Sequence, residues 1–224
     1  MAAAADKTPI EYGVGLRLRN VRIPKGEIEL FLERAGDSGS STTGLGLDLI
    51  RRRGNVELQL GFEFEKIKAG QTTWIESGKD VAAGDAADWV PPDNGGLGWF
   101  TFEFTFLNHA KINKYASIRY GGGAGLGIVT GSLKHYNVFC SGASNGMTEP
   151  GCAPNDPRFG GRATCEENAD CSQVQPVKYN LPPVFPVVNA IIGVQFKPID
   201  KMTINIEGGI RTFLFIGTSA AYFF

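Results

Sequence analysis

The stretch VELQLGFEFEK, Val56 to Lys66, alternates between two kinds of residue without a break. Its apolar positions are Val56, Leu58, Leu60, Phe62 and Phe64, and the positions between them are Glu57, Gln59, Gly61, Glu63 and Glu65. Side chains along a β-strand point alternately to opposite faces, so this pattern predicts a strand with one apolar and one acidic face. The face that meets water decides between a soluble barrel and a membrane barrel.

Size and composition exclude several classes of protein. The chain has 224 residues and a net charge of −1, with no long basic run, so the footprint of a nucleic-acid-binding protein is missing. No run approaches the roughly 18 apolar residues of a spanning helix. A spanning β-barrel leaves no such run, because its apolar residues take every second position. The start, MAAAADKTP, lacks the features of a secretory signal and is interpreted as a mature terminus with an added starting Met.

Period-two runs bounded by turn residues recur along nearly the whole chain and predict an all-β fold. Most are about 9 to 12 residues long, which suits tilted strands that cross a bilayer. The predicted strands are 10–20, 43–52, 56–67, 98–109, 115–131, 187–197, 202–212 and 214–224.

The predicted connections alternate between short and long. Tight turns are expected at 53–55, 110–114 and 198–201, and long connections at 21–42, 68–97 and 132–186, with a short last one near Phe213. All short turns then lie at one end of an antiparallel up-and-down barrel and the long loops at the other, as in outer-membrane barrels. We therefore expect one barrel domain over residues 1–224, with an N-terminal extension at 1–9 and a long extracellular, Cys-containing loop at 132–186.

The segment PKGEIELFLERAG, Pro24 to Gly36, fits two patterns. Ile28, Leu30 and Leu32 alternate with Glu as in a ninth strand, whereas an early Pro and an apolar stripe fit a short helix. Bacterial single-chain barrels have an even number of strands. The prediction is therefore a short helix in the first outside loop.

The apolar face is too bulky to point inward. The interior of eight strands is just wide enough to be filled by side chains or to hold one small ligand, and this face includes Phe62, Phe64, Phe100, Phe102, Phe104 and Phe106. Glycines on the outer surface would also weaken the strands without return. With the apolar face toward lipid both difficulties disappear, and glycine on the concave side leaves room for long charged side chains.

The polar face then lines the lumen. It carries seven acidic and six basic residues, so the charges are able to pair, as burial demands. Arg17, Arg19, Arg119 and Arg211 are expected to bridge to Glu57, Glu63, Glu103 and Glu207. The predicted lumen charge network consists of Arg17, Arg19, Asp48, Glu57, Glu63, Glu65, Glu103, Arg119, Lys197, Glu207 and Arg211.

The chain ends in FIGTSAAYFF, with Phe224 last and Tyr222 on the same face. This ending resembles the terminal signal of outer-membrane barrels, which the barrel-assembly machinery reads in that family. Over residues 10–224 the architecture resembles small eight-stranded outer-membrane barrels of Gram-negative bacteria, of the type of the OmpA membrane domain, OmpX and OmpW. The resemblance implies an integral outer-membrane location, contact with outer-membrane lipid, and Tyr222 and Phe224 as the assembly signal.

Four cysteines lie in one polar segment, at Cys140, Cys152, Cys165 and Cys171. Their spacing matches neither a paired zinc motif nor a redox motif, so two disulfides in an oxidising compartment are expected. Three connectivities are open, of which Cys140 with Cys152 and Cys165 with Cys171 is the most local. Calcium at loop carboxylates is the alternative for Asp156, Glu166, Glu167 and Asp170, but they fit no ligand pattern, and we expect no metal and no cofactor.

Three functions are open to such a barrel. The first is a non-enzymatic scaffold whose disulfide-stabilised surface loops bind a protein partner, because long loops on a rigid scaffold carry function. The alternative is a narrow, porin-like channel for ions or small solutes. A lipid-modifying enzyme is the least favoured, since only His109 and His135 are available as a base. His109 is expected at the short-turn end, and His135 near the outside rim with Ser132 and Tyr136.

Overall fold

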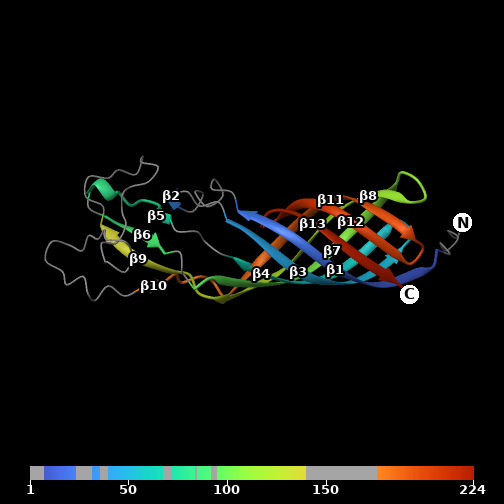
Figure 1. Cartoon of the computed structure of the whole chain (residues 1–224), viewed down its shortest axis with the longest axis horizontal. Coiled ribbons are helices and arrows are strands. Elements are labelled where there is room, and N and C mark those ends of the chain that lie inside the picture. Colours follow the sequence, from blue (N-terminus) through green and yellow to red (C-terminus); the bar gives the residue numbers. More distant parts are fainter. Residues whose placement is uncertain are drawn as a thin grey trace, which may run out of the picture.

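The computed structural model describes residues 8–23, 32–35, 40–67, 72–83, 85–91, 95–139 and 176–224. Eight strands close into an antiparallel barrel in the order β1-β13-β12-β11-β8-β7-β4-β3 (Figure 1). They are β1 (Ile10–Ile23), β3 (Ser40–Arg53), β4 (Val56–Ile67), β7 (Leu97–Lys111), β8 (Ala116–Gly131), β11 (Val184–Ile199), β12 (Met202–Arg211) and β13 (Phe213–Phe223). Since β1 pairs with both β3 and β13, the wall has no open edge and its backbone groups bond within it. The predicted eight-stranded up-and-down barrel is confirmed.

The connections alternate in length as predicted. Gly54 reverses the chain between β3 and β4 with a φ of 60°, a conformation that glycine adopts without strain. Residues 112–115 and 200–201 make the other two turns at this end. The long connections lie at the opposite end, where Thr212 alone, with a φ of 59°, links β12 to β13.

The two faces of the wall differ as the alternation predicts. Leu16 and Phe104 point outward and are 60% and 53% exposed, whereas Arg19 and Glu103 point into the lumen and are each 1% exposed. In a soluble barrel this distribution would leave a large apolar surface in water. In a bilayer it places hydrocarbon against hydrocarbon, and the charges on the concave side.

Parts of the long connections form a second sheet, here called the loop sheet. Its five strands follow the order β10-β9-β6-β5-β2. They are β2 (Leu32–Ala35), β5 (Thr72–Glu76), β6 (Ala86–Val90), β9 (Lys134–Phe139) and β10 (Val177–Lys178). Figure 1 shows the loop sheet beyond the end of the barrel that carries the long connections.

The loop sheet has a small hydrophobic core of its own. Ile75 of β5, Trp89 of β6 and Val138 of β9 are buried together with Val81 and Ala87, and Tyr136 packs against them. The Trp89 and Tyr136 rings lie 5.8 Å apart between centroids. Val81 belongs to a single 3-10 turn, η1 (Val81–Ala83), between β5 and β6. Segments from different connections are thereby joined into one unit.

The predicted helix at 24–36 is wrong for the part that the structure describes. Residues 32–35 form β2, which pairs with β5 of the loop sheet and not with the barrel wall. The alternation at Leu30 and Leu32 indicates a strand. The even number of strands in bacterial barrels argued against one, but that rule counts only strands of the barrel wall. The remainder, 24–31 and 36, lies outside the described residues.

Candidate functional site

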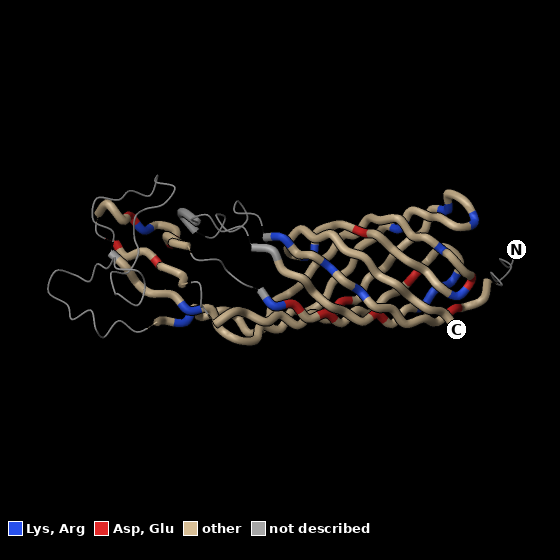
Figure 2. The backbone as a smooth tube through the Cα atoms, viewed as in Figure 1, with Lys and Arg blue, Asp and Glu red and all other residues tan. Residues whose placement is uncertain are grey.

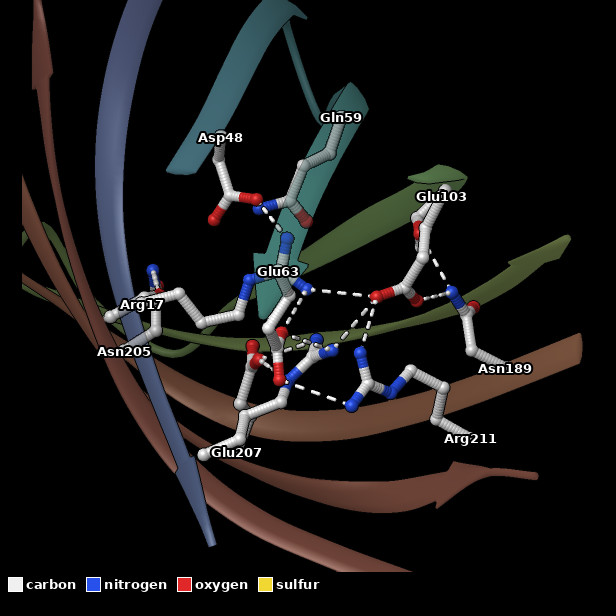
Figure 3. A network of polar contacts seen from close by, with 12 residues as sticks. Arg17, Asp48, Gln59, Glu63, Glu103, Asn189, Asn205, Glu207 and Arg211 are labelled. Atoms are coloured by element: carbon white, nitrogen blue, oxygen red, sulfur yellow. Dashed lines mark hydrogen bonds and ion pairs between the residues drawn. The ribbon is translucent and has the colours of Figure 1, made fainter. Parts of the chain in front are cut away.

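The middle of the lumen is occupied by a cluster of ion pairs (Figure 3). One carboxylate oxygen of Glu103 lies 3.3 Å from Arg17, 3.2 Å from Arg19 and 3.1 Å from Arg211. Its second oxygen accepts a 2.6 Å hydrogen bond from Asn189. Because these residues come from β1, β7, β11 and β12, the cluster spans the lumen from wall to wall.

The remaining carboxylates of this region surround the same three arginines. Glu63 lies 3.3 Å from Arg17 and from Arg19, and 3.1 Å from Arg211. Glu207 accepts a 3.1 Å hydrogen bond from Arg19. Two closer pairs complete the set, Arg17 with Asp48 and Arg211 with Glu65. Charged groups buried in this way require such partners, since one isolated charge would be strongly destabilising.

A second layer lies toward the short turns. Glu57 accepts hydrogen bonds of 2.6 Å from Arg52 and 2.8 Å from Arg119, and His109 Nε2 lies 3.2 Å from the same carboxylate. Arg119 also pairs with Glu207 and so connects this layer to the central cluster.

Neutral polar side chains extend this second layer along the neighbouring strands β11, β12 and β13. Gln195 donates to Asn205 at 2.8 Å, and Asn205 donates to Ser219 at 2.9 Å. All three side chains are buried.

Ten of the eleven residues predicted for the lumen network are brought together. Lys197 is the exception: its side chain is 37% exposed and lies 3.6 Å from Asp200, at the short-turn rim. The register of β11 against β12 shifts between Phe196 and Ile199, where the strand reaches the end of the wall. Alternation predicted the face of Lys197 correctly but carries no information on its depth in the barrel.

Several members of the network were not predicted as site residues. Arg52, His109 and Asn189 are buried and contact its carboxylates, and Gln59 accepts a 2.9 Å bond from Arg119. Alternation had already placed Arg52 and Gln59 on the polar face, and His109 and Asn189 also occupy inward positions of predicted strands, so the same signal could have added all four to the network.

Part of the lumen wall is apolar, which the polar-face prediction did not include. Val21, Leu107, Ile191 and Phe215 are buried in one cluster. Phe215 pairs with Val21 on one side and Gly209 on the other, and Ile191 pairs with Gly209 and Gly121. The two glycines therefore lie between larger side chains of one stripe that crosses the strands.

Glycines make room in the lumen for two different reasons. A Cβ on Gly61 would collide with the Arg17 guanidinium, which agrees with the prediction that glycine leaves space for long charged side chains. On β8 a Cβ at Gly121, Gly123 or Gly125 would instead collide with carbonyl oxygens of β7. There glycine permits close approach of two backbones.

Aromatic rings support two of the arginines. The Arg19 guanidinium lies 4.3 Å from the Phe215 ring centroid, and that of Arg52 lies 4.2 Å from Phe223. Cation–π contacts of this kind strengthen when water is excluded. Toward the long connections, Trp99 packs edge to face on Phe185, with ring centroids 4.2 Å apart.

A partly buried cluster of polar side chains lies against the loop sheet. Tyr179 donates a 2.5 Å hydrogen bond to Asp88, and the His135 ring stacks on Tyr179 at 4.0 Å with its Nε2 3.6 Å from Asp88. Burial, then the hydrogen bond to Asp88, then the charges of Asp88 and Glu76 raise the pKa of Tyr179 above its ordinary value. His135 thus contacts Asp88 and Tyr179 rather than the predicted neighbours Ser132 and Tyr136.

Some predicted residues lie elsewhere or outside the described residues. Tyr222 of β13 and Phe224, the residue after this strand, are 49% and 70% exposed, on the lipid side of the wall. The segment 140–175, with all four cysteines and the loop carboxylates weighed for calcium, is not among the described residues. In the described part of the chain no cluster of three or more His, Cys, Asp or Glu side chains is arranged to hold a metal ion.

No protein-family model and no curated protein matches the sequence. Among solved structures the chain is similar to the attachment invasion locus protein Ail of Yersinia pestis, in complex with the heparin analogue sucrose octasulfate. The identity is 12%, the TM-score is 0.44, and the match covers 96% of this chain and 99% of that one. The translocator domain of the autotransporter NalP from Neisseria meningitidis matches at 7% identity and a TM-score of 0.34, over 98% of this chain and 90% of that one.

An outer-membrane channel from Pseudomonas putida F1 matches at 8% identity and a TM-score of 0.29, over 100% of both chains. Likeness at this level assigns no activity, and the membrane assignment follows from the barrel itself. A closed antiparallel barrel of even strand number with an apolar outer wall is the form in which strands cross a bacterial outer membrane. The chain is an integral outer-membrane β-barrel protein.

Proposed function

We propose that the chain is a non-enzymatic scaffold in which the barrel anchors the loop sheet outside the membrane, where the loop sheet binds a protein partner. The observation that carries the proposal is the contrast between the two ends. The short-turn end has only tight connections, whereas the long connections of the other end contribute a sheet with a buried core of Ile75, Trp89 and Val138. A rigid platform held above a membrane anchor is suited to presenting surface loops.

The filled lumen supports a scaffold over a channel. Arg17, Arg19 and Arg211 converge on Glu103 within 3.3 Å, and the opening of a path would require these buried charges to separate. We expect no conductance in planar bilayers at any voltage tested. A unitary conductance that shifts in Glu103→Gln would contradict the scaffold proposal and support the channel.

The contacts of His135 support the absence of enzymatic activity. Its ring is covered by Tyr179 and faces Asp88, and the Tyr179 hydroxyl donates its hydrogen bond to Asp88 and not to His135. We expect mass spectra of outer membranes to show the same lipid A species for His135→Ala as for the wild type. Loss of a modification in that variant would assign an enzyme.

The scaffold proposal is tested by removing from an intact barrel the segment that connects β9 (Lys134–Phe139) to β11 (Val184–Ile199), together with β10 (Val177–Lys178) of the loop sheet. We expect replacement of residues 139–178 by a short Gly-Ser linker to preserve the folded barrel. Folding is seen in SDS–PAGE as a band that migrates differently in unheated and heated samples, and this assay is called cold electrophoresis below. The same variant is expected to lose capture of a specific surface protein from intact target cells. The matched control is Phe104→Leu, which alters only the lipid-facing wall. Equal capture by all three chains would overturn the proposal.

Barrel and loop sheet are proposed to form a single domain.

Two further parts of the proposal concern biogenesis and the segment 140–175. We expect Phe224→Ala to slow insertion by the barrel-assembly machinery in a reconstituted assay. Two disulfides among Cys140, Cys152, Cys165 and Cys171 are expected, so the oxidised protein should contain no thiol that reacts with maleimide.

A further inference from the structure

The short-turn end of the barrel contains a cavity that the scaffold function does not use. Its volume is about 340 Å³, within the range of small-ligand sites. Side chains from β1, β3, β7, β11 and the β7–β8 turn line it, among them Glu11, Arg52, His109, Lys111, Lys114 and Lys197. Figure 2 shows Lys and Arg gathered at this end of the tube.

The charged lining of this cavity is unbalanced, with four Lys or Arg residues, Arg52, Lys111, Lys114 and Lys197, against Glu11 alone. Within the described part of the chain, Lys111 and Lys114 form no ion pair, and the only acidic group that Lys197 reaches is the exposed Asp200 at 3.6 Å. Lys114 lies 4.7 Å from the ring centroid of Tyr115. A cleft lined by one sign of charge concentrates counter-ions.

The inner side of the cavity borders the second layer of the lumen network. Arg52, Arg119 and His109 all converge on the single carboxylate Glu57. His109 is 7% exposed, and its Nε2 lies 3.2 Å from Glu57 without the alignment of a hydrogen bond, so this buried nitrogen has no hydrogen-bond partner. His109 and Arg52 thus separate the cavity from the lumen network behind them.

The rim of the cavity adjoins the lipid-facing wall. Ile112, Tyr115 and Ile199, from the same turns as the lysines, are 60%, 57% and 59% exposed. Apolar and aromatic side chains next to lysines at the edge of a barrel match the boundary between acyl chains and head groups.

We propose that this cavity is a binding site for a phosphate-type oxyanion on the periplasmic side of the membrane. Several lysines act as point charges toward phosphate oxygens, and Arg52 with His109 closes the site from inside. The phosphate comes either from the head group of an anionic phospholipid in the periplasm-facing leaflet or from free phosphate. The chemistry of the site is shared by both sources.

The test uses the whole purified chain in a phosphate-free, uncharged detergent. Titration calorimetry with inorganic phosphate tests the free anion, and native mass spectrometry with phosphatidylglycerol against phosphatidylethanolamine tests the lipid. The variant Lys111→Gln/Lys114→Gln/Lys197→Gln removes three surface charges from the lining. The matched control Arg22→Gln/Lys66→Gln removes charges from exposed positions at the opposite rim.

We expect the triple variant to weaken binding at least about tenfold, with each lysine near a phosphate contributing roughly fivefold, and the control to leave it unchanged. Saturable binding of inorganic phosphate that the triple variant loses supports a free-anion site. Selective retention of phosphatidylglycerol that the triple variant loses supports a head-group site. Equal behaviour of wild type, triple variant and control toward both ligands would overturn the proposal, with cold electrophoresis showing that all three are folded.

Discussion

Arg211 of β12 donates a 3.1 Å hydrogen bond across the lumen to Glu103 of β7, although β11 and β8 separate the two strands in the wall. Arg211 also pairs with Glu63 and Glu65 on β4. One guanidinium thus joins three strands that lie on both sides of the lumen. Such cross-lumen contacts hold a barrel closed in addition to its strand ladders.

Loss of this guanidinium should destabilise the barrel. In Arg211→Gln three buried carboxylates lose a cationic partner, and breaking a buried pair typically costs about 3 to 5 kcal/mol. We expect urea unfolding in lipid vesicles to show a loss of that order. Arg22→Gln, at an exposed rim position, should change the free energy of unfolding by less than about 0.5 kcal/mol. Equal stability of the two variants would contradict the role of the cluster.

The orientation of the wall predicts a depth-dependent penalty on its outer face. Phe104 lies near the middle of β7 and is 53% exposed. Phe104→Arg should therefore cost about 2 to 4 kcal/mol of unfolding free energy in vesicles, because it places a charge at mid-bilayer. Leu214→Arg, near the end of β13, should cost about 0 to 1 kcal/mol. A monomeric chain that folds in buffer without detergent would refute the orientation itself.

Two adjacent glycines on β12 allow a matched test of backbone approach. A Cβ on Gly209 would collide with the Ala190 carbonyl, whereas the nearest atom to a Cβ on Gly208 is the Phe215 oxygen at 3.4 Å. We expect Gly209→Ala to destabilise the barrel by about 1 to 3 kcal/mol, the range of overpacking changes, and Gly208→Ala to be near neutral. Thermal shifts of the heat-modifiable band measure both. If Gly208→Ala were the more destabilising variant, the strands would have to move apart to accept a Cβ at Gly209.

Much of the barrel was predictable because one physical signal, alternation, recurs in every strand. It gave all eight strands and the direction of Arg19, Glu63 and Glu103, since space inside eight strands excludes the phenylalanines. It could not give the apolar stripe at Ile191 and Phe215, because that stripe forms only when register brings residues of different strands side by side.

The loop sheet was beyond prediction for a different reason. Its strands have two to six residues, so apart from the alternation before β2 they carry little periodic signal, and their partners lie far away in the sequence. β2 pairs with β5 across about forty residues, and β6 with β9 across about fifty. Only tertiary contacts, such as those of Trp89, select these pairings.

The core of the loop sheet should be a separate unit of stability. Trp89 is 3% exposed in the small core of the loop sheet, and Trp→Ala in a core typically costs about 3 to 5 kcal/mol. We expect Trp89→Ala to make the loop sheet sensitive to limited proteolysis while the barrel remains resistant. Val177→Ala, at a 46% exposed edge position, serves as the control and should match wild type. Loss of the barrel in Trp89→Ala would show that the two parts unfold together.

The hydrogen bond from Tyr179 to Asp88 predicts an alkaline limit for the loop sheet. Burial and the Asp88 carboxylate raise the pKa of Tyr179, so the folded form holds the phenolic proton more tightly than the unfolded chain does. The contribution to stability is therefore complete below the unfolded pKa of about 10 and is lost as the pH rises above it. We expect wild-type proteolysis of the loop sheet to accelerate from about pH 10, while Tyr179→Phe shows less change over that range. Tyr120→Phe, on the lipid-facing side of β8, should keep the wild-type profile. If Tyr179→Phe retained the full alkaline loss, the effect would have to come from another group, and the hydrogen bond to Asp88 would not set the limit.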